Sequence, residues 1–322
     1  MRAIVQDHYG SPQELKLTEV DKPAIGGEDV LVRVRAAGVN PADWAITSGL
    51  PYIARPVYGL RKPETGIRGT DVAGEVEAVG ASVTRFRPGD EVFGWCTGAF
   101  AEYASAREDA LELKPANLTF EQAAAVPMAG FVALQALRDQ GKLRAGQKVL
   151  VNGASGGIGT FAVQIAKSLG AYVTGVCSTR NVDLVRSIGA DHVIDYTRED
   201  FTQSDQRYDF ILDNVGNHSL SSLRRVLAPT GTLVPNGGGF DNRWFAGGGR
   251  VIGALVLSRF VSQTLRPFLV SPTQKDLVVL RELLEAGEVT PVIDRTYLLS
   301  ETPQAVGHVG GGHARGKVAI TV

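Results

Sequence analysis

Short apolar runs separated by glycine dominate the first third of the chain. The runs that alternate polar and apolar residues or are rich in β-branched residues are AIVQ, DVLVRVRAAGV, VAGEVEAVG, DEVFGW and FAEYA. Closely spaced short strands with turn signals between them are typical of a small antiparallel barrel or sandwich. We therefore predict a β-rich domain over about residues 1–120.

From about residue 121 the hydrophobic pattern changes to strands that alternate with helices. The run KVLVN (Lys148 to Asn152) is a predicted buried strand, and apolar residues then recur at helical spacing from Ile158 to Leu169. The alternation continues through YVTGVC, HVIDY, YDFILD and GTLVPN. This order indicates βαβ units around a parallel sheet, so we predict a doubly wound Rossmann domain over residues 121–267.

The remaining part, residues 268–322, contains one predicted helix and two β-prone pieces. The helix is TQKDLVVLRELLEAG, and the β-prone pieces are VIDRTYLL and GKVAITV. We expect both pieces to return to the sheet of the first domain. The chain is thus predicted to be an α/β protein with a nucleotide-binding domain inserted into a β domain.

A glycine-rich turn connects the first predicted Rossmann strand to the following helix. Glycines in this position let a backbone approach a pyrophosphate, and the N–H groups at the start of the helix bind its charge. The alternative is that the glycines only make a tight connection; the flanking strand and helix favour dinucleotide binding. The predicted cofactor-binding residues of the turn are Ser155, Gly156, Gly157, Ile158 and Gly159.

The end of the second predicted strand distinguishes the two nicotinamide dinucleotides. Rossmann domains that bind NADH place Asp or Glu there, whereas this chain has Ser178, Thr179 and Arg180. Hydroxyl groups and a guanidinium suit the additional 2′-phosphate, so NADPH is the expected cofactor. The alternative for Arg180 is an ordinary solvated residue, and Tyr196 is either a cover for the adenosine or a plain turn aromatic.

Composition and charge exclude several classes of protein. The 33 basic and 34 acidic residues give a net charge of -1, which provides no field for nucleic acid or an anionic membrane. The two cysteines, Cys96 and Cys177, form no disulfide framework or metal motif. The longest nearly apolar stretch, Ala123 to Leu137, is too short for a membrane span, and the first residues carry no apolar signal core. We therefore expect a cytoplasmic protein.

Several segments of the chain resemble the medium-chain dehydrogenase/reductase superfamily, in its zinc-free quinone oxidoreductase branch. The segments are GVNPAD, GTDVAGEVEAVG, PGDEVFG, AAAVPMAGFVALQAL, NGASGGIGTFAVQIAK, GADHVIDY and HARGKVAI. Within this branch, GASGGIGTFAVQ, VCS and FILDNVG are most similar to the reticulon-interacting oxidoreductase subgroup. The resemblance implies a GroES-like β-barrel domain made from both ends of the chain, with the Rossmann domain between them.

The resemblance also implies that no zinc is bound. Zinc-dependent relatives hold the metal through Cys, a His-Glu pair and a second Cys or Asp, whereas the matching positions here are Asn40, Thr70 with Asp71, and Ala125. An amide, a hydroxyl and a methyl group do not replace thiolates and an imidazole. No metal site is therefore expected.

Together these patterns predict hydride transfer from NADPH to a quinone or an α,β-unsaturated carbonyl compound. Such acceptors delocalise the charge that they gain, so modest hydrogen-bond donors suffice in place of a metal. The expected catalytic residues are Asn40, which is also expected to contact the cofactor, and Tyr52; the plain alternative for Asn40 is a turn former before Pro41. The resemblance places further cofactor contacts at Asn214, Val215, Gly237, Phe268 and Val270.

Two other functions stay open. The first is an NADPH-binding protein without turnover that acts as a redox sensor or partner, and the second is an alcohol dehydrogenase. The glycines Gly247 to Gly249 and the apolar run after them are expected to form a lid and then an edge strand for pairing. The family resemblance favours a homodimer.

Overall fold

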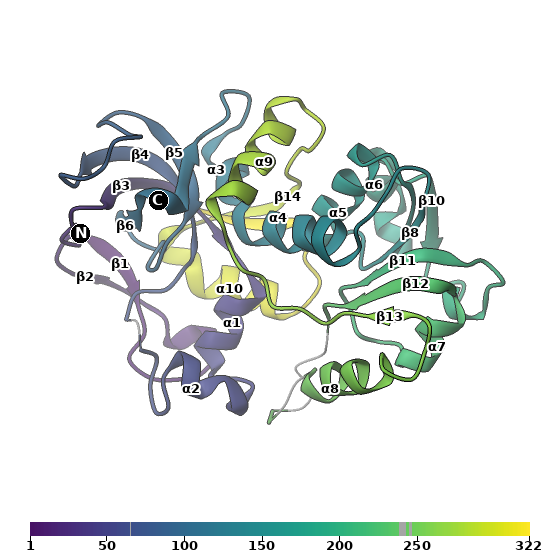
Figure 1. The fold of residues 1–322 in the computed structure, drawn as a ribbon. Coiled ribbons are helices and arrows are strands. Elements are labelled where there is room, and N and C mark those ends of the chain that lie inside the picture. The colour runs from purple at the N-terminus through teal and green to yellow at the C-terminus, as the bar shows by residue number, and fades with distance from the viewer. Residues whose placement is uncertain (65, 238–242, 245–246) are drawn as a thin grey trace. The chain divides into compact units, whose positions relative to one another are not determined.

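The computed structural model describes residues 1–64, 66–237, 243–244 and 247–322. These residues form two compact units (Figure 1). The first contains Met1–Phe131, Ser271–Gly287 and Pro291–Val322, and the second contains Val132–Val270 and Glu288–Thr290. The domain limits expected at residues 120 and 267 stay predictions.

The first unit is built on a mainly antiparallel sheet with the strand order β14-β15-β3-β4-β5-β7, in which β6 also pairs with β3. A separate hairpin pairs β1 with β2. The C-terminal strand β15 pairs with β3, so the end of the chain completes the sheet begun near its start, as predicted. The strands are β1 (Arg2–Val5), β2 (Lys16–Glu19), β3 (Asp29–Val39), β4 (Asp71–Val79), β5 (Glu91–Trp95), β6 (Tyr103–Arg107), β7 (Leu111–Leu113), β14 (Ile293–Leu298) and β15 (Lys317–Thr321).

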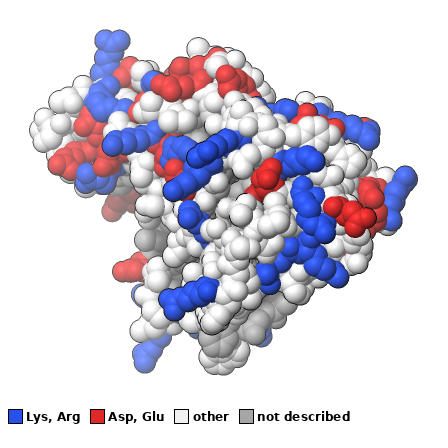
Figure 2. All heavy atoms as spheres, turned by 45° about the vertical axis from the view of Figure 1, so that its right-hand side comes forward, with Lys and Arg blue, Asp and Glu red and all other residues white. Residues whose placement is uncertain are grey.

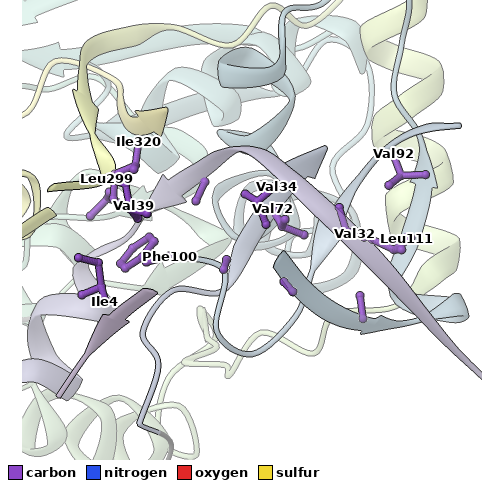
Figure 3. Packing of buried hydrophobic residues seen from close by; sticks show 14 of the residues in the cluster. Ile4, Val32, Val34, Val39, Val72, Val92, Phe100, Leu111, Leu299 and Ile320 are labelled. Atoms are coloured by element: carbon purple, nitrogen blue, oxygen red, sulfur yellow. The ribbon is translucent and has the colours of Figure 1, made fainter. Parts of the chain in front are cut away.

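The core of the first unit is formed by apolar residues from strands that are distant in the sequence. Val34 of β3 and Val72 of β4 lie together at its centre, and Ile320 of β15 packs near Val39 (Figure 3). These side chains are almost fully removed from water, and the burial of each stabilises the folded state by about 1.5–3 kcal/mol. Helices α1 (Pro41–Ser48), α2 (Arg55–Tyr58), α3 (Phe120–Ala124), α9 (Gln274–Glu285) and α10 (Thr302–Gly310) complete this unit.

The second unit is built on a parallel sheet with the strand order β10-β9-β8-β11-β12-β13. The order reverses between β8 and β11, which is the arrangement of a doubly wound Rossmann sheet. The elements are β8 (Lys148–Asn152), α5 (Gly157–Ser168), β9 (Tyr172–Cys177), α6 (Val182–Ser187), β10 (His192–Asp195), β11 (Tyr208–Asp213), α7 (Leu220–Arg225), β12 (Leu227–Pro235), α8 (Gly248–Leu257) and β13 (Thr264–Leu265). Helix α4 (Pro127–Leu134) and a π-helical turn (Gln135–Gln140) precede β8.

The helix ends follow from local sequence. Helix α9 begins after Thr273, whose side chain accepts the N–H of Asp276 at 3.2 Å. Its buried residues Leu277, Leu280 and Leu284 recur at helical spacing and face the interior. Helix α5 is followed by Gly170, whose φ of 77° is easily adopted only by glycine.

One segment of the second unit differs from the sequence prediction. The apolar run after Gly247 to Gly249 was expected to be an edge strand, but Gly248–Leu257 forms helix α8. A short apolar run flanked by glycines is compatible with either a buried helix or a strand, and its hydrophobic pattern alone does not distinguish the two. The edge of the sheet is the two-residue strand β13. The glycines expected to form a lid begin this helix, since Gly247 is its N-cap and α8 starts at Gly248. Residues 238–242 and 245–246, which precede them, lie outside the described residues.

The surface carries charges of both signs. On the face drawn in Figure 2, basic and acidic side chains are interspersed, in keeping with the net charge of -1. Within the described ranges, no helix is both long enough and apolar enough to cross a membrane.

Candidate functional site

The glycine-rich turn lies between β8 and α5, at the carboxyl edge of the parallel sheet. Gly153 follows β8 with a φ of 80°, and Gly156 is the N-cap of α5. A Cβ atom on Gly159 would lie 2.1 Å from the carbonyl oxygen of Gly153, so close packing alone requires this glycine. A Cβ atom on Gly156 would meet only that oxygen, at 3.4 Å. Packing therefore does not explain Gly156, whereas a ligand phosphate at the helix start does.

Two serines beside this turn are joined by one buried amide. Asn181 donates through Nδ2 to Ser155 Oγ at 2.9 Å and to Ser178 Oγ at 3.3 Å. Because both serine oxygens accept these bonds, each hydroxyl proton is left to donate to a ligand. The structure thus brings Ser155 of the turn together with Ser178 at the end of β9, and both sets of predicted cofactor residues share one edge.

A carboxylate lies closer to the predicted 2′-phosphate position than the sequence suggested. Asp195, the last residue of β10, is paired in register with Cys177 of β9. Its Oδ2 accepts the hydroxyl of Thr179 at 2.6 Å, and this bond is the main cause that lowers the pKa of Asp195. No acidic residue stands among Ser178, Thr179 and Arg180 after β9, but the neighbouring strand β10 supplies one. Arg180 and Tyr196 are exposed beside it.

The ends of β8, β11 and β12 are organised around the fully buried Asp213. Its carboxylate accepts from Asn152 Nδ2 at 2.8 Å and pairs with Arg250. It also accepts the N–H of Val215 at 3.3 Å, while its backbone carbonyl accepts the N–H of Gly237 at 2.7 Å. This arrangement holds the predicted residues Asn214, Val215 and Gly237 together at one edge of the sheet.

Asn214 carries a buried polar atom that the protein leaves unused. Its Oδ1 accepts from Asn236 at 2.8 Å, but its Nδ2 has no hydrogen-bond partner among the described residues. A buried donor without a partner is costly, and a ligand oxygen would satisfy it. A Cβ atom on Gly237 would lie 2.2 Å from the carbonyl carbon of Asn214, so only glycine permits this close approach. The predicted residues Phe268 and Val270 follow β13, and both are half-buried.

In the first unit, strand register gathers three polar residues from distant parts of the chain. Asn40 follows the last residue of β3, Asp71 begins β4 and Lys317 begins β15. Because β4 and β15 both run antiparallel to β3, their first residues lie beside its end: Asp71 pairs with Gly38, and Val318 pairs with Val39. With Asp43 of α1, these residues form what we call the Asn40 corner (Asn40, Asp43, Asp71 and Lys317).

The side chain of Asn40 is held on both sides. Its Nδ2 donates to Asp71 Oδ2 at 2.9 Å, and its Oδ1 accepts from Lys317 Nζ. Lys317 Nζ also donates to the carbonyl of Val39 at 3.3 Å and lies 3.6 Å from Asp71 Oδ2. Asn40 is the N-cap residue of α1, but its side chain makes no capping hydrogen bond, so a turn-forming role alone does not account for it.

Burial shifts the pKa values of this corner. Asn40 is 6 % exposed, Asp43 and Lys317 are 3 % exposed, and Asp71 is fully buried. Burial raises the pKa of Asp43 to about 7, although its bond from the N–H of Asn40 opposes this. Burial likewise raises the pKa of Asp71 and lowers that of Lys317, while the attraction between the two opposes both shifts.

Tyr52, the second predicted catalytic residue, lies in a short 3-10 turn, Tyr52–Ala54. The guanidinium of Arg55 stacks over its ring at 4.7 Å, and the side chain is half-buried. Lys317 is the residue that sequence reasoning missed; the available signal was a lysine that opens a predicted apolar strand, GKVAITV.

Two family models match the chain. The alcohol dehydrogenase GroES-like domain matches residues 26–116, and the zinc-binding dehydrogenase domain matches residues 188–320. The first match confirms the predicted GroES-like domain. Among the residues described here, no group of three or more His, Cys, Asp or Glu is placed to hold a metal ion.

Relatives of known class cover the whole chain. The mouse mitochondrial NAD(P)H oxidoreductase RTN4IP1 is 37 % identical over 355 residues, which span 100 % of this chain and 89 % of that protein. A chloroplastic quinone-oxidoreductase homologue from spinach is 32 % identical over 334 residues, 99 % of this chain and 98 % of that one. The solved quinone oxidoreductase of Coxiella burnetii is 31 % identical, covers 100 % of this chain and 99 % of its own, and has a TM-score of 0.87.

These relatives correct one prediction and confirm others. The expected cytoplasmic location is wrong, because the mouse relative is a mitochondrial protein and the spinach relative a chloroplastic one. Cysteine content and the lack of a long apolar stretch, on which that expectation was mainly based, do not specify the compartment of a protein. The predicted fold and family are confirmed. The chain belongs to the medium-chain dehydrogenase/reductase superfamily, in the quinone oxidoreductase branch with RTN4IP1, and is an NAD(P)H-dependent oxidoreductase.

Proposed function

We propose that this oxidoreductase uses NADPH to reduce quinones or α,β-unsaturated carbonyl compounds, and that it does so without zinc. The observation that supports this most strongly is the Asn40 corner. Two of the positions that match zinc ligands in other members of the superfamily, Asn40 and Asp71, are hydrogen-bonded to each other and contact the ammonium group of Lys317.

Zinc does not fit this arrangement. A zinc ion at Asn40 and Asp71 would have to displace the buried cation of Lys317 or stand beside it, and like charges repel strongly in a medium of low dielectric constant. The remaining matched positions, Thr70 and Ala125, supply no thiolate or imidazole. The corner already balances its negative charge with its own lysine.

The residues of the second unit fit a nicotinamide dinucleotide that carries a 2′-phosphate. The N–H groups of Gly157, Ile158 and Gly159 at the start of α5, together with Ser155, suit the pyrophosphate, and the space at Gly156 admits it. Ser178 and Arg180 would bind the 2′-phosphate, with Tyr196 beside the adenosine. Asn214 Nδ2 is the free donor for the nicotinamide end, where Val215, Gly237, Phe268 and Val270 would also contact the cofactor. When bound, NADPH supplies the hydride.

The hydrogen-bond donors that the site offers to the acceptor oxygen determine which class of acceptor suits it. An alkoxide formed from a simple ketone needs strong charge stabilisation, which a metal normally supplies. A phenolate or enolate spreads its charge, so one or two preorganised N–H or O–H donors suffice. The amide of Asn40 and the hydroxyl of Tyr52 are donors of this strength. Quinones and enones therefore suit the site better than simple alcohols or ketones.

Steady-state NADPH oxidation tests the proposal. The purified protein is assayed with a panel of quinones, enones, saturated ketones and alcohols, before and after treatment with a zinc chelator. We expect turnover with quinones or enones that the chelator does not reduce. Tight NADPH binding without turnover of any acceptor would instead support a non-catalytic role, and chelator-sensitive alcohol oxidation would support an alcohol dehydrogenase.

The choice of NADPH over NADH has its own test. Replacing Arg180 with Ala removes the guanidinium expected to pair with the 2′-phosphate. The ratio of the NADH to the NADPH dissociation constant should fall by about tenfold, as expected for the loss of one charge-assisted hydrogen bond. An unchanged ratio would show that Arg180 does not select the cofactor.

A further inference from the structure

The ion pair inside the Asn40 corner has no evident structural purpose. Lys317 is 3 % exposed and Asp71 is fully buried, so both charges have lost nearly all of their hydration. Attraction within a buried pair often only offsets this loss, and apolar replacements are frequently as stable. Both members contact one neutral side chain, that of Asn40, which suggests that the pair serves the amide.

The contacts of the amide allow only one orientation. Lys317 Nζ can only donate, so it must face Asn40 Oδ1, and the Asp71 carboxylate accepts, so it must face Nδ2. Exchanging the oxygen and nitrogen of the amide would oppose donor to donor and acceptor to acceptor. Asp71 is itself fixed by the backbone N–H of Met128, which donates to its Oδ1 at 3.2 Å.

We propose that Lys317 and Asp71 are positioning residues that turn the Asn40 amide into a directed hydrogen-bond donor for a ligand oxygen. One N–H of Nδ2 is bound to Asp71, which leaves the second for the ligand. A cation at the amide oxygen favours the charge-separated resonance form of the amide, which makes its N–H groups stronger donors. The anion at the amide nitrogen fixes which N–H is left for the ligand. This inference rests on the proposed function and identifies the chemistry of the atom that Asn40 contacts.

The ligand atom is therefore an oxygen that accepts a hydrogen bond. Two sources share this chemistry: the carbonyl or quinone oxygen of the acceptor, and a ribose hydroxyl of the nicotinamide cofactor. The first becomes more negative as the acceptor is reduced, so a directed donor would lower the barrier. The second would place the donor in the binding of the cofactor.

A double-mutant cycle tests whether the pair acts through Asn40. The first variant, Lys317→Met with Asp71→Asn, removes both charges of the pair together, so that neither is left without the other. The second is Asn40→Ala, and the third combines all three changes. We expect kcat/KM to fall on the order of tenfold in the first variant and on the order of 100-fold in the second.

The combined variant gives the decisive result. If the pair acts through the amide, kcat/KM of the combined variant should equal that of Asn40→Ala to within about threefold, because the amide on which the pair acts is already absent. If the two losses multiply, or if the charge-free variant keeps its full kcat/KM, the proposal is wrong. An unchanged dissociation constant for NADPH with a lower kcat identifies the acceptor oxygen, and a weaker NADPH affinity with an unchanged acceptor KM identifies the ribose.

A matched control separates positioning from general destabilisation. Glu112 of β7 is 3 % exposed and pairs with Arg281 at 3.1 Å and with Arg85, all within the first unit. Glu112→Gln removes a buried carboxylate from an ion pair outside the corner, whose arginines are partly exposed. It should lower the melting temperature without changing kcat/KM at a temperature where the protein is folded. A loss of kcat/KM equal to that of the charge-free variant would overturn the proposal.

The orientation of the amide can also be measured without cofactor. In protein labelled with ¹⁵N-asparagine, the two Nδ2 protons of Asn40 should differ widely in chemical shift, because one is bound to a carboxylate. The signal is assigned by its absence in Asn40→Ala. The separation should shrink in the charge-free variant, and an unchanged separation would contradict the proposal. If the wild type reduces no acceptor but this spectrum changes as expected, the proposed function fails and the positioning remains.

Discussion

Asp43 and Asp195 are two carboxylates whose neighbours give them opposite properties. Asp43 is buried at the first turn of α1, and burial raises its pKa to about 7. Asp195 lies at the end of β10, where hydrogen bonds from Thr179 and Thr197 lower its pKa. The first therefore binds a proton near neutral pH, whereas the second stays ionised beside the predicted 2′-phosphate position. Each difference leads to a measurable consequence.

Asp43 should make the protein less stable as the pH rises. Its pKa is about 7 in the folded chain against an ordinary 3.8, so the stability that its proton contributes is fully present below about pH 4 and is lost as the pH rises to 7. In this window the unfolding free energy of the wild type should fall relative to Asp43→Asn by up to about 1.4 kcal/mol per pH unit. Chemical denaturation at several pH values measures this difference.

The other charges around Asp43 are Asp71, Lys317 and Arg68, and they remain in the variant. The difference between the two proteins therefore isolates Asp43. Asp183→Asn, which alters a fully exposed carboxylate on α6, serves as the control and should parallel the wild type. Parallel curves for Asp43→Asn as well would contradict the raised pKa.

The charge of Asp195 should reduce the preference of the protein for NADPH over NADH. Its negative charge is hydrogen-bonded to Thr179, the residue between Ser178 and Arg180. Replacing it with Asn removes a like charge near the 2′-phosphate and should increase the preference for NADPH over NADH by about threefold to tenfold. Dissociation constants from fluorescence titration measure the ratio. Glu199→Gln, which alters an exposed carboxylate in the loop after β10, should leave the ratio of the NADH to the NADPH dissociation constant unchanged. A lower ratio in Asp195→Asn would contradict the predicted repulsion.

Single residues were predictable where function depends on local sequence, and not where it depends on strand pairing. The glycines of the turn follow from their position between a strand and a helix. Lys317 was missed because its contact with Asn40 joins residues separated by 277 positions. Asp195 was missed for a similar reason, because it ends β10 whereas its partner Thr179 follows a different strand, β9. Pairing between distant strands is a property of the folded sheet that no local pattern carries.

At the scale of elements, α5 and its preceding turn carry the cofactor prediction. The strands and helices of the parallel sheet followed from hydrophobic periodicity, and most lie where that periodicity predicted them. The exception is α8, whose sequence GGRVIGALVL is apolar enough to suit either a buried helix or a strand. The glycines before α5 divide into those that packing requires and those that it does not.

Substitutions at two of these glycines should separate folding from binding. Gly159→Ala places a Cβ atom 2.1 Å from the carbonyl oxygen of Gly153 and should cost about 1–3 kcal/mol of stability. Gly156→Ala meets only an ordinary contact and should leave the melting temperature nearly unchanged, but weaken NADPH binding by about tenfold or more. Thermal melts and titrations of both variants measure the two effects.

Gly249→Ala is the control for these substitutions. Its backbone is helical within α8, and a Cβ atom there would meet nothing within 4 Å. Neither stability nor NADPH affinity should fall. Equal losses of affinity in Gly156→Ala and in this control would remove the case for a phosphate at the start of α5.

At the scale of the whole molecule, segments from both ends of the sequence build the first unit. Helix α9 contributes Arg281, which pairs with Glu112 of β7, and Arg85 pairs with the same carboxylate. Removing the charge of Glu112 takes the carboxylate away from two guanidinium groups, although Arg281 keeps Glu285 at 3.8 Å and Arg85 keeps the carbonyl of Glu108. Because these groups are partly exposed to water, Glu112→Gln should lower the unfolding free energy by about 2 kcal/mol. Denaturation in urea measures this loss, and a change below about 0.5 kcal/mol would show that the pair is neutral for stability.

The lysine on the last strand affects how the protein matures. Until β15 has been synthesised and has paired with β3, the two carboxylates of the Asn40 corner have no ammonium group to balance them. A nascent chain that still lacks this strand must keep these acids hydrated or protonated. Competence for catalysis would then be acquired only after Lys317 has been synthesised and β15 has paired with β3.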